Sequence, residues 1–441
     1  MRIVKNVTYG KYTEKEEKIM AQSTIAIIIL VGVLVLYAVP SIPLSVTTIF
    51  AMLAMAMSGV LTYTEAFNGF ANSAVLLVAG MMVIGRACFT SGLAQRFGNL
   101  LFRFVGAKEK KFMIMVILIA SAMAVFLNGS LVVAMMMPII DSVASQSGGK
   151  ISRKQIYFPL GLASTIGNNL TTISATSMIT AAGLISAAGY GELSLFAPTV
   201  VNLPALLIVI VLYIFFGYDL QKKWFNFDEI PIDAAANGTD GITGSTMKMW
   251  ITGGVLVAVV IALIAGVNSG TVALAGSAVL ILTRCIDERD AYKSISWPSV
   301  IIVAGAIGFS AGLDKSGAGL VIAEFILKLF GAAGQSPFGI CIVLFILGSL
   351  LSNVMSDNAT VAVLIPITLS LAATLGCDPI PMVLACASGI KVAVATPVSV
   401  APMTMIQVPG YRFKDYLRVG GLVNLISLIV TCAVIWIAYY M

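Results

Sequence analysis

The sequence predicts an all-α polytopic membrane protein made of two inverted repeats, each with five transmembrane helices and one re-entrant hairpin. Of its 441 residues, 59% are hydrophobic and only 10% are charged, whereas a soluble domain carries about 25% charged residues. Apolar runs long enough to cross a bilayer, about 20 residues each, recur along the whole chain. Two apolar stretches also contain a small polar cluster ten residues before a proline, at Asn128 and at Ser356.

The expected spans follow one another with short polar connections. Residues 1–21 form a polar N-terminal segment that lacks the apolar core and cleavage site of a signal peptide, so we expect the first apolar segment to be retained. Residues 218–246 form the only long polar loop. The spans are expected near residues 22–39, 43–62, 73–89, 157–180, 196–217, 247–266, 269–284, 297–313, 380–396 and 419–440.

Short matches at a nearly constant offset indicate an internal repeat. Val78-Ala79-Gly80 corresponds to Val303-Ala304-Gly305, 225 residues later, and Pro138 corresponds to Pro366 after a three-residue insertion. The first repeat is then 22–217 with a hairpin at 112–145, and the second is 247–441 with a hairpin at 337–375. Each repeat has an odd number of crossings, so the second is expected to be inverted.

The basic residues favour hairpins that approach from opposite sides. Lysines and arginines flank both ends of the first polar-centred segment, so both ends are expected in the cytoplasm, together with loop 218–246. The second segment has no basic residue at either end and is expected to enter from outside. This topology places the N-terminus outside despite its five basic residues. Alternatively, each segment is a pair of ordinary crossings, with its polar cluster at a membrane surface.

Several function classes are excluded by what the sequence lacks. There is no histidine, so His-ligated metals and Ser–His or Cys–His catalytic units are excluded, and we expect no enzyme. The cysteines have no C-x-x-C spacing and indicate neither a metal site nor a disulfide framework. No phosphate-binding loop is present, so we expect no ATP. The net charge of +6 belongs to the loops and does not indicate nucleic acid.

The stretches 163–172, 393–397 and 409–420, together with the two hairpins, carry a specific resemblance. The chain resembles the divalent anion–sodium symporter family, within the superfamily that also includes arsenite permeases and some sodium/proton antiporters. The resemblance implies a homodimer, elevator-like movement, and hairpin tips reading Ser-Asn-Thr that bind sodium and a carboxylate together with broken helices. Free N–H groups and helix ends suit an anion, and free carbonyls suit a cation.

The site residues of the family can be assigned to positions of this chain by counting back from the proline that follows each hairpin tip. The resemblance implies substrate binding by residues of the tips and broken helices: Asn128, Gly129, Ser130, Thr171, Thr172, Ser356, Asn358, Thr396 and Pro397. It implies sodium, the only expected cofactor-like ion, at Asn128, Gly129, Gly167, Asn358 and Ala395. Small polar residues also mediate helix packing in membranes, so Thr171, Thr172 and Ser174 have a structural alternative.

The chain departs from the family pattern in both halves. The first tip has Gly129-Ser130 instead of Asn-Thr, and the second has Asp357 instead of a neutral Asn. Lys391 lies within an apolar span, at the counterpart of Gly167. Because ionised residues at membrane depth are costly, we hypothesise an Asp357–Lys391 ion pair whose ammonium replaces one sodium. Loss of its proton would give proton coupling or exchange; alternatively, Lys391 only neutralises Asp357.

The sequence therefore predicts a secondary active transporter of a small anion such as a dicarboxylate, citrate or sulfate. It would be sodium-coupled, proton-coupled or exchanging, and would lie in the plasma (inner) membrane. The alternative is a cation/proton antiporter or arsenite-type permease of the same superfamily. Arg86, near the end of its span, is expected to extend to the cytoplasm rather than contact substrate.

Overall fold

The computed structural model describes residues 2–37, 39, 41–93, 108–229, 246–331, 334, 336–397 and 400–441. Over these residues every regular element is a helix, which confirms the all-α prediction. Eight helical segments are long and apolar enough to cross a membrane: Met20–Tyr37, Tyr63–Thr90, Ala197–Trp224, Thr246–Ile264, Trp297–Lys315, Pro337–Val354, Asp357–Leu375 and Phe413–Tyr439. The protein is thus a multi-pass membrane protein, and the count of ten crossings stays a prediction.

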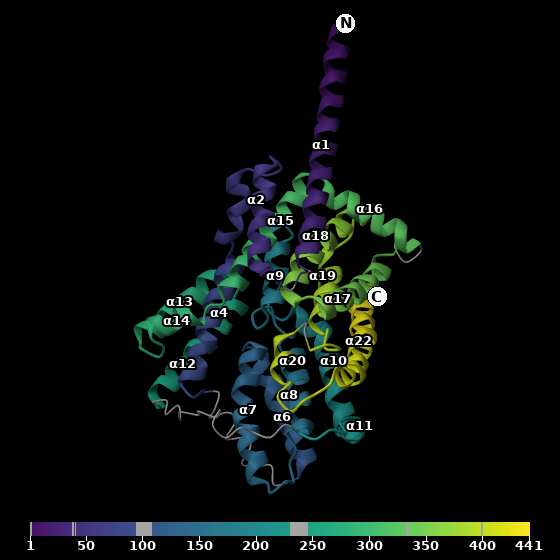
Figure 1. Cartoon of the computed structure of the whole chain (residues 1–441). Helices are drawn as coiled ribbons and strands as arrows, with labels where there is room; N and C mark the ends of the chain where they lie inside the picture. The colour runs from purple at the N-terminus through teal and green to yellow at the C-terminus, as the bar shows by residue number, and fades with distance from the viewer. Residues whose placement is uncertain are drawn as a thin grey trace.

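One group of helices surrounds α4 and α15 (Figure 1). Helix α13 packs on α4, and α2 packs on α15. The group comprises α1 (Arg2–Tyr37), α2 (Leu44–Met57), α3 (Tyr63–Phe67), η1 (Asn68–Ala71), α4 (Ser73–Thr90), α12 (Thr246–Ile264), α13 (Ser269–Leu282), α14 (Glu288–Ser294), α15 (Trp297–Lys315) and α16 (Ala318–Phe330). Helix α1 begins at Arg2, so the expected polar N-terminal segment, residues 1–21, is helical from that residue onward.

The second group contains the two polar clusters. Here α6 packs on α8, α17 on α19, and α10 on α22. The first half of the chain contributes α6 (Glu109–Ala124), α7 (Gly129–Gln146), α8 (Arg153–Gly167), α9 (Thr176–Ala187), α10 (Ala197–Leu212), η2 (Tyr213–Gly217) and α11 (Tyr218–Trp224). The second half contributes α17 (Pro337–Val354), α18 (Asp357–Leu375), α19 (Pro379–Lys391), α20 (Ala401–Met405), α21 (Phe413–Asp415), η4 (Tyr416–Gly420) and α22 (Gly421–Tyr439).

Both expected hairpins are helix–turn–helix units whose two helices contact each other, α6 with α7 and α17 with α18. Polar side chains begin the second helix of each hairpin, as N-cap residues should. Helices α17 and α18 are each long enough to cross a bilayer. Whether the hairpins are re-entrant or cross fully therefore stays a prediction, as does the inversion of the repeats.

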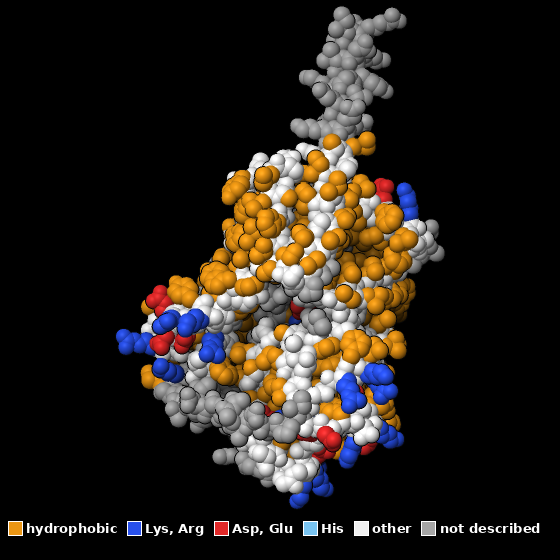
Figure 2. All heavy atoms as spheres, viewed as in Figure 1, with side chains coloured by type: hydrophobic (Ala, Val, Ile, Leu, Met, Phe, Trp, Pro, Cys, Tyr) orange, Lys and Arg blue, Asp and Glu red, His pale blue; other side chains and the backbone are white. Residues whose placement is uncertain are grey.

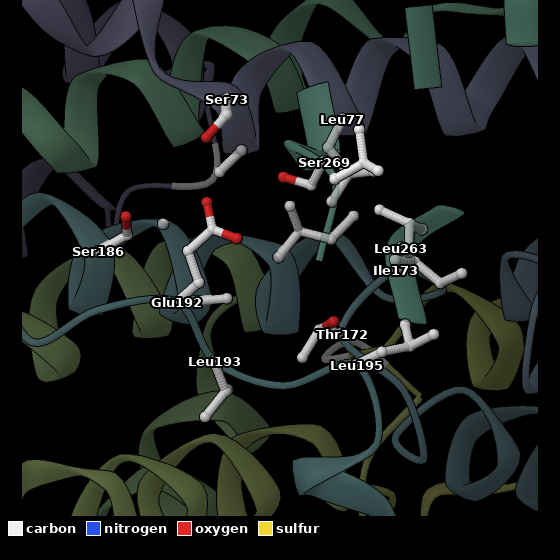
Figure 3. A pocket seen from close by; sticks show the side chains of 15 residues that line it. Ser73, Leu77, Thr172, Ile173, Ser186, Glu192, Leu193, Leu195, Leu263 and Ser269 are labelled. Carbon is white, nitrogen blue, oxygen red and sulfur yellow. The ribbon is translucent and has the colours of Figure 1, made fainter. Parts of the chain in front are cut away.

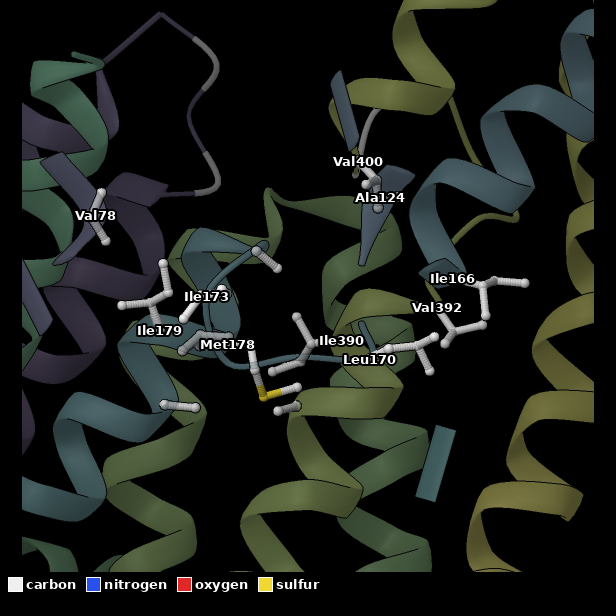
Figure 4. Packing of buried hydrophobic residues seen from close by; sticks show 14 of the residues in the cluster. Val78, Ala124, Ile166, Leu170, Ile173, Met178, Ile179, Ile390, Val392 and Val400 are labelled. Atoms are coloured by element: carbon white, nitrogen blue, oxygen red, sulfur yellow. The ribbon is translucent and has the colours of Figure 1, made fainter. Parts of the chain in front are cut away.

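The two helices expected to be broken are interrupted. Helix α8 ends at Gly167 and α9 starts at Thr176, while α19 ends at Lys391, six residues before Pro397. Residues 395–397, where the break in the span 380–396 was expected, are not helical, and the interruption begins earlier, directly after Lys391. Figure 4 shows apolar side chains of the two interruptions packed together, including Leu170 and Val392. The breaks therefore lie side by side in the core rather than at a surface.

Side-chain types separate clearly on the surface (Figure 2). Apolar side chains cover the upper part of the view, which suits contact with lipid. Lysine, arginine and acidic side chains gather most densely around α14 at mid-height and at the lower end near α6, α7 and α11, and a smaller charged group lies over α16 at the upper right. The region around α14 and the region near α6, α7 and α11 both contain loops that the basic residues assign to the same side of the membrane. In this view, however, the two regions lie at different heights.

Candidate functional site

A cavity of about 780 Å³ lies between the two groups of helices. Both hairpin tips line it: Asn128 and Ser130 from the first, Asp357 and Asn358 from the second. Its size falls within the range of small-molecule sites, about 300–1,000 Å³. Further lining residues come from both broken helices, from α20 and from the α4–α14 side: Asn168, Thr176, Lys391, Val400, Pro402, Met405, Met82, Arg86, Asp290 and Lys293.

The first tip is held by a cap and by a close backbone contact. Asn128 Oδ1 accepts a hydrogen bond of 3.0 Å from the Ser130 N–H and so begins α7. A Cβ at Gly129 would lie 2.9 Å from Ser164 O and 3.2 Å from Pro402 Cγ, closer than a side chain tolerates. The close contact favours glycine at this position of the first tip.

The second tip contains the charge pair that the sequence predicted. Lys391 Nζ lies 2.9 Å from Asp357 Oδ2, and the side chains are only 6% and 14% exposed. Asp357 Oδ1 also accepts a 2.9 Å hydrogen bond from the Asn358 N–H, and Ser356 Oγ accepts one from the Ala359 N–H. Both oxygens of Asp357 are therefore engaged, as a buried carboxylate requires.

The two broken helices are tied to their hairpins in the same way. The Thr171 hydroxyl donates to Val125 O at 2.5 Å, and the Thr396 hydroxyl donates to Asn353 O at 2.8 Å. The two threonines are 225 residues apart, the offset of the repeat. Thr171 is buried and also bonded to Ser174, so its hydroxyl serves the link between hairpin and break.

The remaining sequence-predicted residues do not line the large cavity. Thr172 instead lines a separate cavity of about 70 Å³, where Figure 3 shows it near Leu195 and below Glu192 and Ser73. Gly167 packs against the α6 backbone, where a Cβ would lie 2.6 Å from Ser121 O. The lining of the large cavity also leaves out Gly129, Thr171, Ser356, Ala395, Thr396 and Pro397.

Several buried oxygens near the tips have no hydrogen-bond partner among the described residues. In the first half these are Asn168 Oδ1, Ser164 Oγ and Ser121 Oγ. In the second half they are Asn358 Oδ1, Ser352 Oγ and Ser388 Oγ. Buried oxygens in folded proteins usually have a partner, so these oxygens are available to a water, an ion or a ligand. Asn168 was not among the predicted site residues, although it directly follows Gly167.

Sequence reasoning missed the wall of the cavity that faces the tips. Arg86 on α4, whose expected extension to the cytoplasm stays a prediction, lines the cavity with Lys293 and Asp290 of α14. Its guanidinium carbon lies 5.2 Å from the centre of the Phe89 ring. A charge within a span was the available signal, but only the packing of α14 beside α4 identifies what it faces.

A second cavity of about 550 Å³ lies where the repeat would place the counterpart of the first. Six lining positions of the two cavities correspond at an offset of 225 residues: Glu65 with Asp290, Asn68 with Lys293, Gly69 with Ser294, Met82 with Ile307, Gly85 with Ser310 and Arg86 with Ala311. The second cavity reaches α18 only at Pro366 and beyond, not at its tip. The tips therefore open toward one cavity alone.

The base of the first hairpin is fixed by charges and aromatic rings. Arg153 lies between Asp141, at 3.8 Å, and Glu229, at 3.4 Å. The Tyr411 hydroxyl donates to Lys154 O at 2.6 Å and accepts from the Phe158 N–H. Burial raises the pKa of Tyr411 well above its ordinary value, so this phenol stays neutral.

The model of the citrate transporter family CitMHS matches residues 25–389 and 321–441 of this chain. The chain belongs to this family. Among relatives, SdcS of Staphylococcus aureus, a sodium-dependent dicarboxylate transporter, is 22% identical over 91% of the chain and 82% of its own length. The uncharacterized transporter YfbS of Escherichia coli is 35% identical over 31% of the chain. The alignments cover only 22% of YfbS and 27% of a second uncharacterized transporter, sll0640 of Synechocystis.

Two solved structures share the fold. The YdaH transporter of Alcanivorax borkumensis superposes with a TM-score of 0.62 and 17% identity, covering 86% of this chain and 88% of that one. MtrF of Neisseria gonorrhoeae gives 0.61 and 15% identity, covering 95% of each chain. At this identity the likeness concerns the fold only. Together with the family, it identifies a transporter rather than an enzyme, as expected from the sequence.

Proposed function

We propose that this citrate-family transporter is a secondary active transporter of a small carboxylate, a dicarboxylate or citrate. The observation that carries the proposal is the cavity shared by both hairpin tips. Two helices begin at residues that line it, α9 at Thr176 and α18 at Asp357, and α7 begins at Gly129, next to the lining residue Ser130. The positive dipole ends of helix N-termini attract a carboxylate, and backbone N–H groups there that are not engaged in caps can donate hydrogen bonds to it.

Neutral side chains supply the remaining contacts for the anion. Asn128, Ser130 and Asn358 line the cavity from the two tips, and amide and hydroxyl groups donate hydrogen bonds without a fixed countercharge. The relative SdcS is named for sodium-dependent dicarboxylate transport, and the family model is that of a citrate transporter. Both support a di- or tricarboxylate over sulfate as substrate.

The coupling sites differ between the two halves. In the first half, Gly129 packs against the Ser164 carbonyl and the Asn168 side chain, and Ser164 Oγ and Asn168 Oδ1 have no hydrogen-bond partner among the described residues. We propose that these oxygens, with backbone carbonyls of the tip and of Gly167, bind a sodium ion. In the second half, the Lys391 ammonium lies next to Asp357. We propose that this tethered ammonium takes the place of the sodium that Asn358 and Ala395 would otherwise bind.

Movement of the hairpin group against the α4–α15 group would expose the site alternately. The tips line one of two corresponding cavities and not the other, as expected when a moving unit has been displaced toward one side. The different levels of the two charged regions in Figure 2 agree with such a displacement. These observations support an elevator-type mechanism.

The decisive experiment is uptake of labelled succinate and citrate into membrane vesicles under imposed sodium or proton gradients. We expect uptake of at least one of the two, and Lys391→Gln should increase its dependence on sodium because a neutral side chain frees the second ion site. Lys391→Arg, which keeps the charge, is the matched control. Unchanged sodium and proton dependence in Lys391→Gln would leave Lys391 a neutralising residue only.

The buried Asp357–Lys391 pair favours one alternative, a cation/proton antiporter. That function predicts movement of sodium or protons across the vesicle membrane without any carboxylate present. Sodium-driven proton movement without carboxylate uptake would replace the anion proposal.

A further inference from the structure

Arg86 is a cation in the tip cavity with no carboxylate partner among the described residues. It lines the same cavity as Asn128, Ser130 and Asn358, but it comes from α4, in the other group of helices. Of the cations that line this cavity, Lys391 forms an ion pair, whereas none of the ion pairs within the described residues includes Arg86. Its guanidinium carbon lies 5.2 Å from the centre of the Phe89 ring, a contact that orients a guanidinium while leaving its N–H groups available.

The wall that contains Arg86 carries a net positive charge. Arg86 and Lys293 contribute two positive charges to the lining, and Asp290 contributes one negative charge. The cavity's remaining charged groups, Asp357 and Lys391, neutralise each other at 2.9 Å. A carboxylate at the tips would therefore face an excess of positive charge across the cavity.

The corresponding wall of the second cavity has the opposite sign. The counterpart of Arg86 is Ala311, and the charged lining residues there are Glu65, Asp314 and Lys315. Lys315 is paired with Glu65 at 2.7 Å, so the carboxylate of Asp314 is in excess. Two walls related by the repeat thus differ in charge where an anion would pass.

We propose that Arg86 is an anion-binding residue of the α4–α14 wall, which makes the protein bind its carboxylate more tightly on that side than on the other. The inference rests on the proposed function. When the tips face the α4–α14 wall, the guanidinium attracts the carboxylate and can donate two parallel hydrogen bonds to it. When the tips face the second cavity, Ala311 offers neither charge nor donor.

The expected size follows from a single charge interaction in a wide, hydrated cavity. Two unit charges a few ångströms apart interact by roughly 1 kcal/mol in bulk water and more near a protein surface. Loss of the guanidinium should therefore weaken binding on the α4–α14 side about five- to tenfold. Binding on the other side should change less than about twofold.

The test measures KM for labelled succinate and citrate from each side, in right-side-out and inside-out vesicles. By the distribution of basic residues, the α4–α14 side is the cytoplasmic one and faces the medium in inside-out vesicles. Arg86→Gln should raise KM in inside-out vesicles about five- to tenfold, while Arg86→Lys should retain most of the affinity. Ala311→Arg, the matched variant of the second wall, should lower KM in right-side-out vesicles.

Each other outcome overturns the proposal in a distinguishable way. If the unmodified protein transports neither anion from either side, the proposed function fails and the inference falls with it. If it transports one of them but Arg86→Gln changes both KM values equally, or neither, Arg86 does not confer sidedness. If Arg86→Gln does not reach the membrane, Ala311→Arg decides, and an unchanged external KM refutes the inference.

Discussion

The Asp357–Lys391 pair gives the sharpest prediction about the stability of the second hairpin. The two side chains are 2.9 Å apart and 14% and 6% exposed, so removing one leaves the other charged, buried and unpaired. Breaking a buried pair in this way costs about 3–5 kcal/mol, because the remaining charge has lost both water and partner. Lys391→Met and Asp357→Asn should each lower the free energy of unfolding by about this amount.

The double variant separates the pair from the individual side chains. Asp357→Asn combined with Lys391→Met removes both charges at once and should cost less than either single substitution. The assay is denaturant unfolding of the purified protein in detergent, followed by the fluorescence of its four tryptophans. The difference between the double variant and the sum of the single ones gives the interaction energy of the pair.

Two results would refute this reasoning. If the single effects simply add in the double variant, the two charges do not stabilise each other in the folded protein. If Lys391→Met alone leaves the stability unchanged, Asp357 is neutralised by something other than Lys391, such as a bound cation or a proton. In that case the proposal of a tethered ammonium at the second ion site would also be lost.

Three further substitutions test the tip, the break and the hairpin base. Gly129→Ala should reduce transport at least about tenfold by displacing the tip, because small misplacements in a site are costly. The control is Gly32→Ala, whose added Cβ would meet nothing within 4 Å and which should transport normally. Equal uptake by the two variants would disprove the importance of the Gly129 contact. Thr171→Val should lower unfolding stability by about 1–3 kcal/mol through an unsatisfied carbonyl, and no loss would show that water replaces the hydroxyl. Tyr411→Phe should cost a similar amount in stability, with KM unchanged; a changed KM would connect the base to the site.

The fold class and the charge pair could be predicted from the sequence because both depend on local signals. Continuous apolar runs identify membrane helices regardless of how they pack. Lys391 and Asp357 were predicted to pair because each is costly alone within apolar sequence and the repeat brings the tip to the broken helix. The structure contains that pair at 2.9 Å.

Other features depend on contacts between distant segments. The break expected around Pro397 is present, but it begins six residues earlier, where α19 ends at Lys391. Beyond it, the Val394 N–H donates to Asn424 Oδ1 and the Thr396 hydroxyl donates to Asn353 O. These partners on α22 and α17 draw the chain out of the helix before the proline. No pattern within residues 380–397 indicates them.

The differences between the repeats are more informative about function than their likeness. Thr171 and Thr396 make the same hydrogen bond to their hairpins, so the two halves keep one way of holding a tip against a break. At Gly167 and Lys391, and again at Arg86 and Ala311, the same positions carry different charges. Two chemically identical halves would bind ions and substrate alike from both faces. At each of these positions only one half carries a cation. This difference allows the repeat to couple transport to one ion and to bind the substrate more tightly on one side of the membrane.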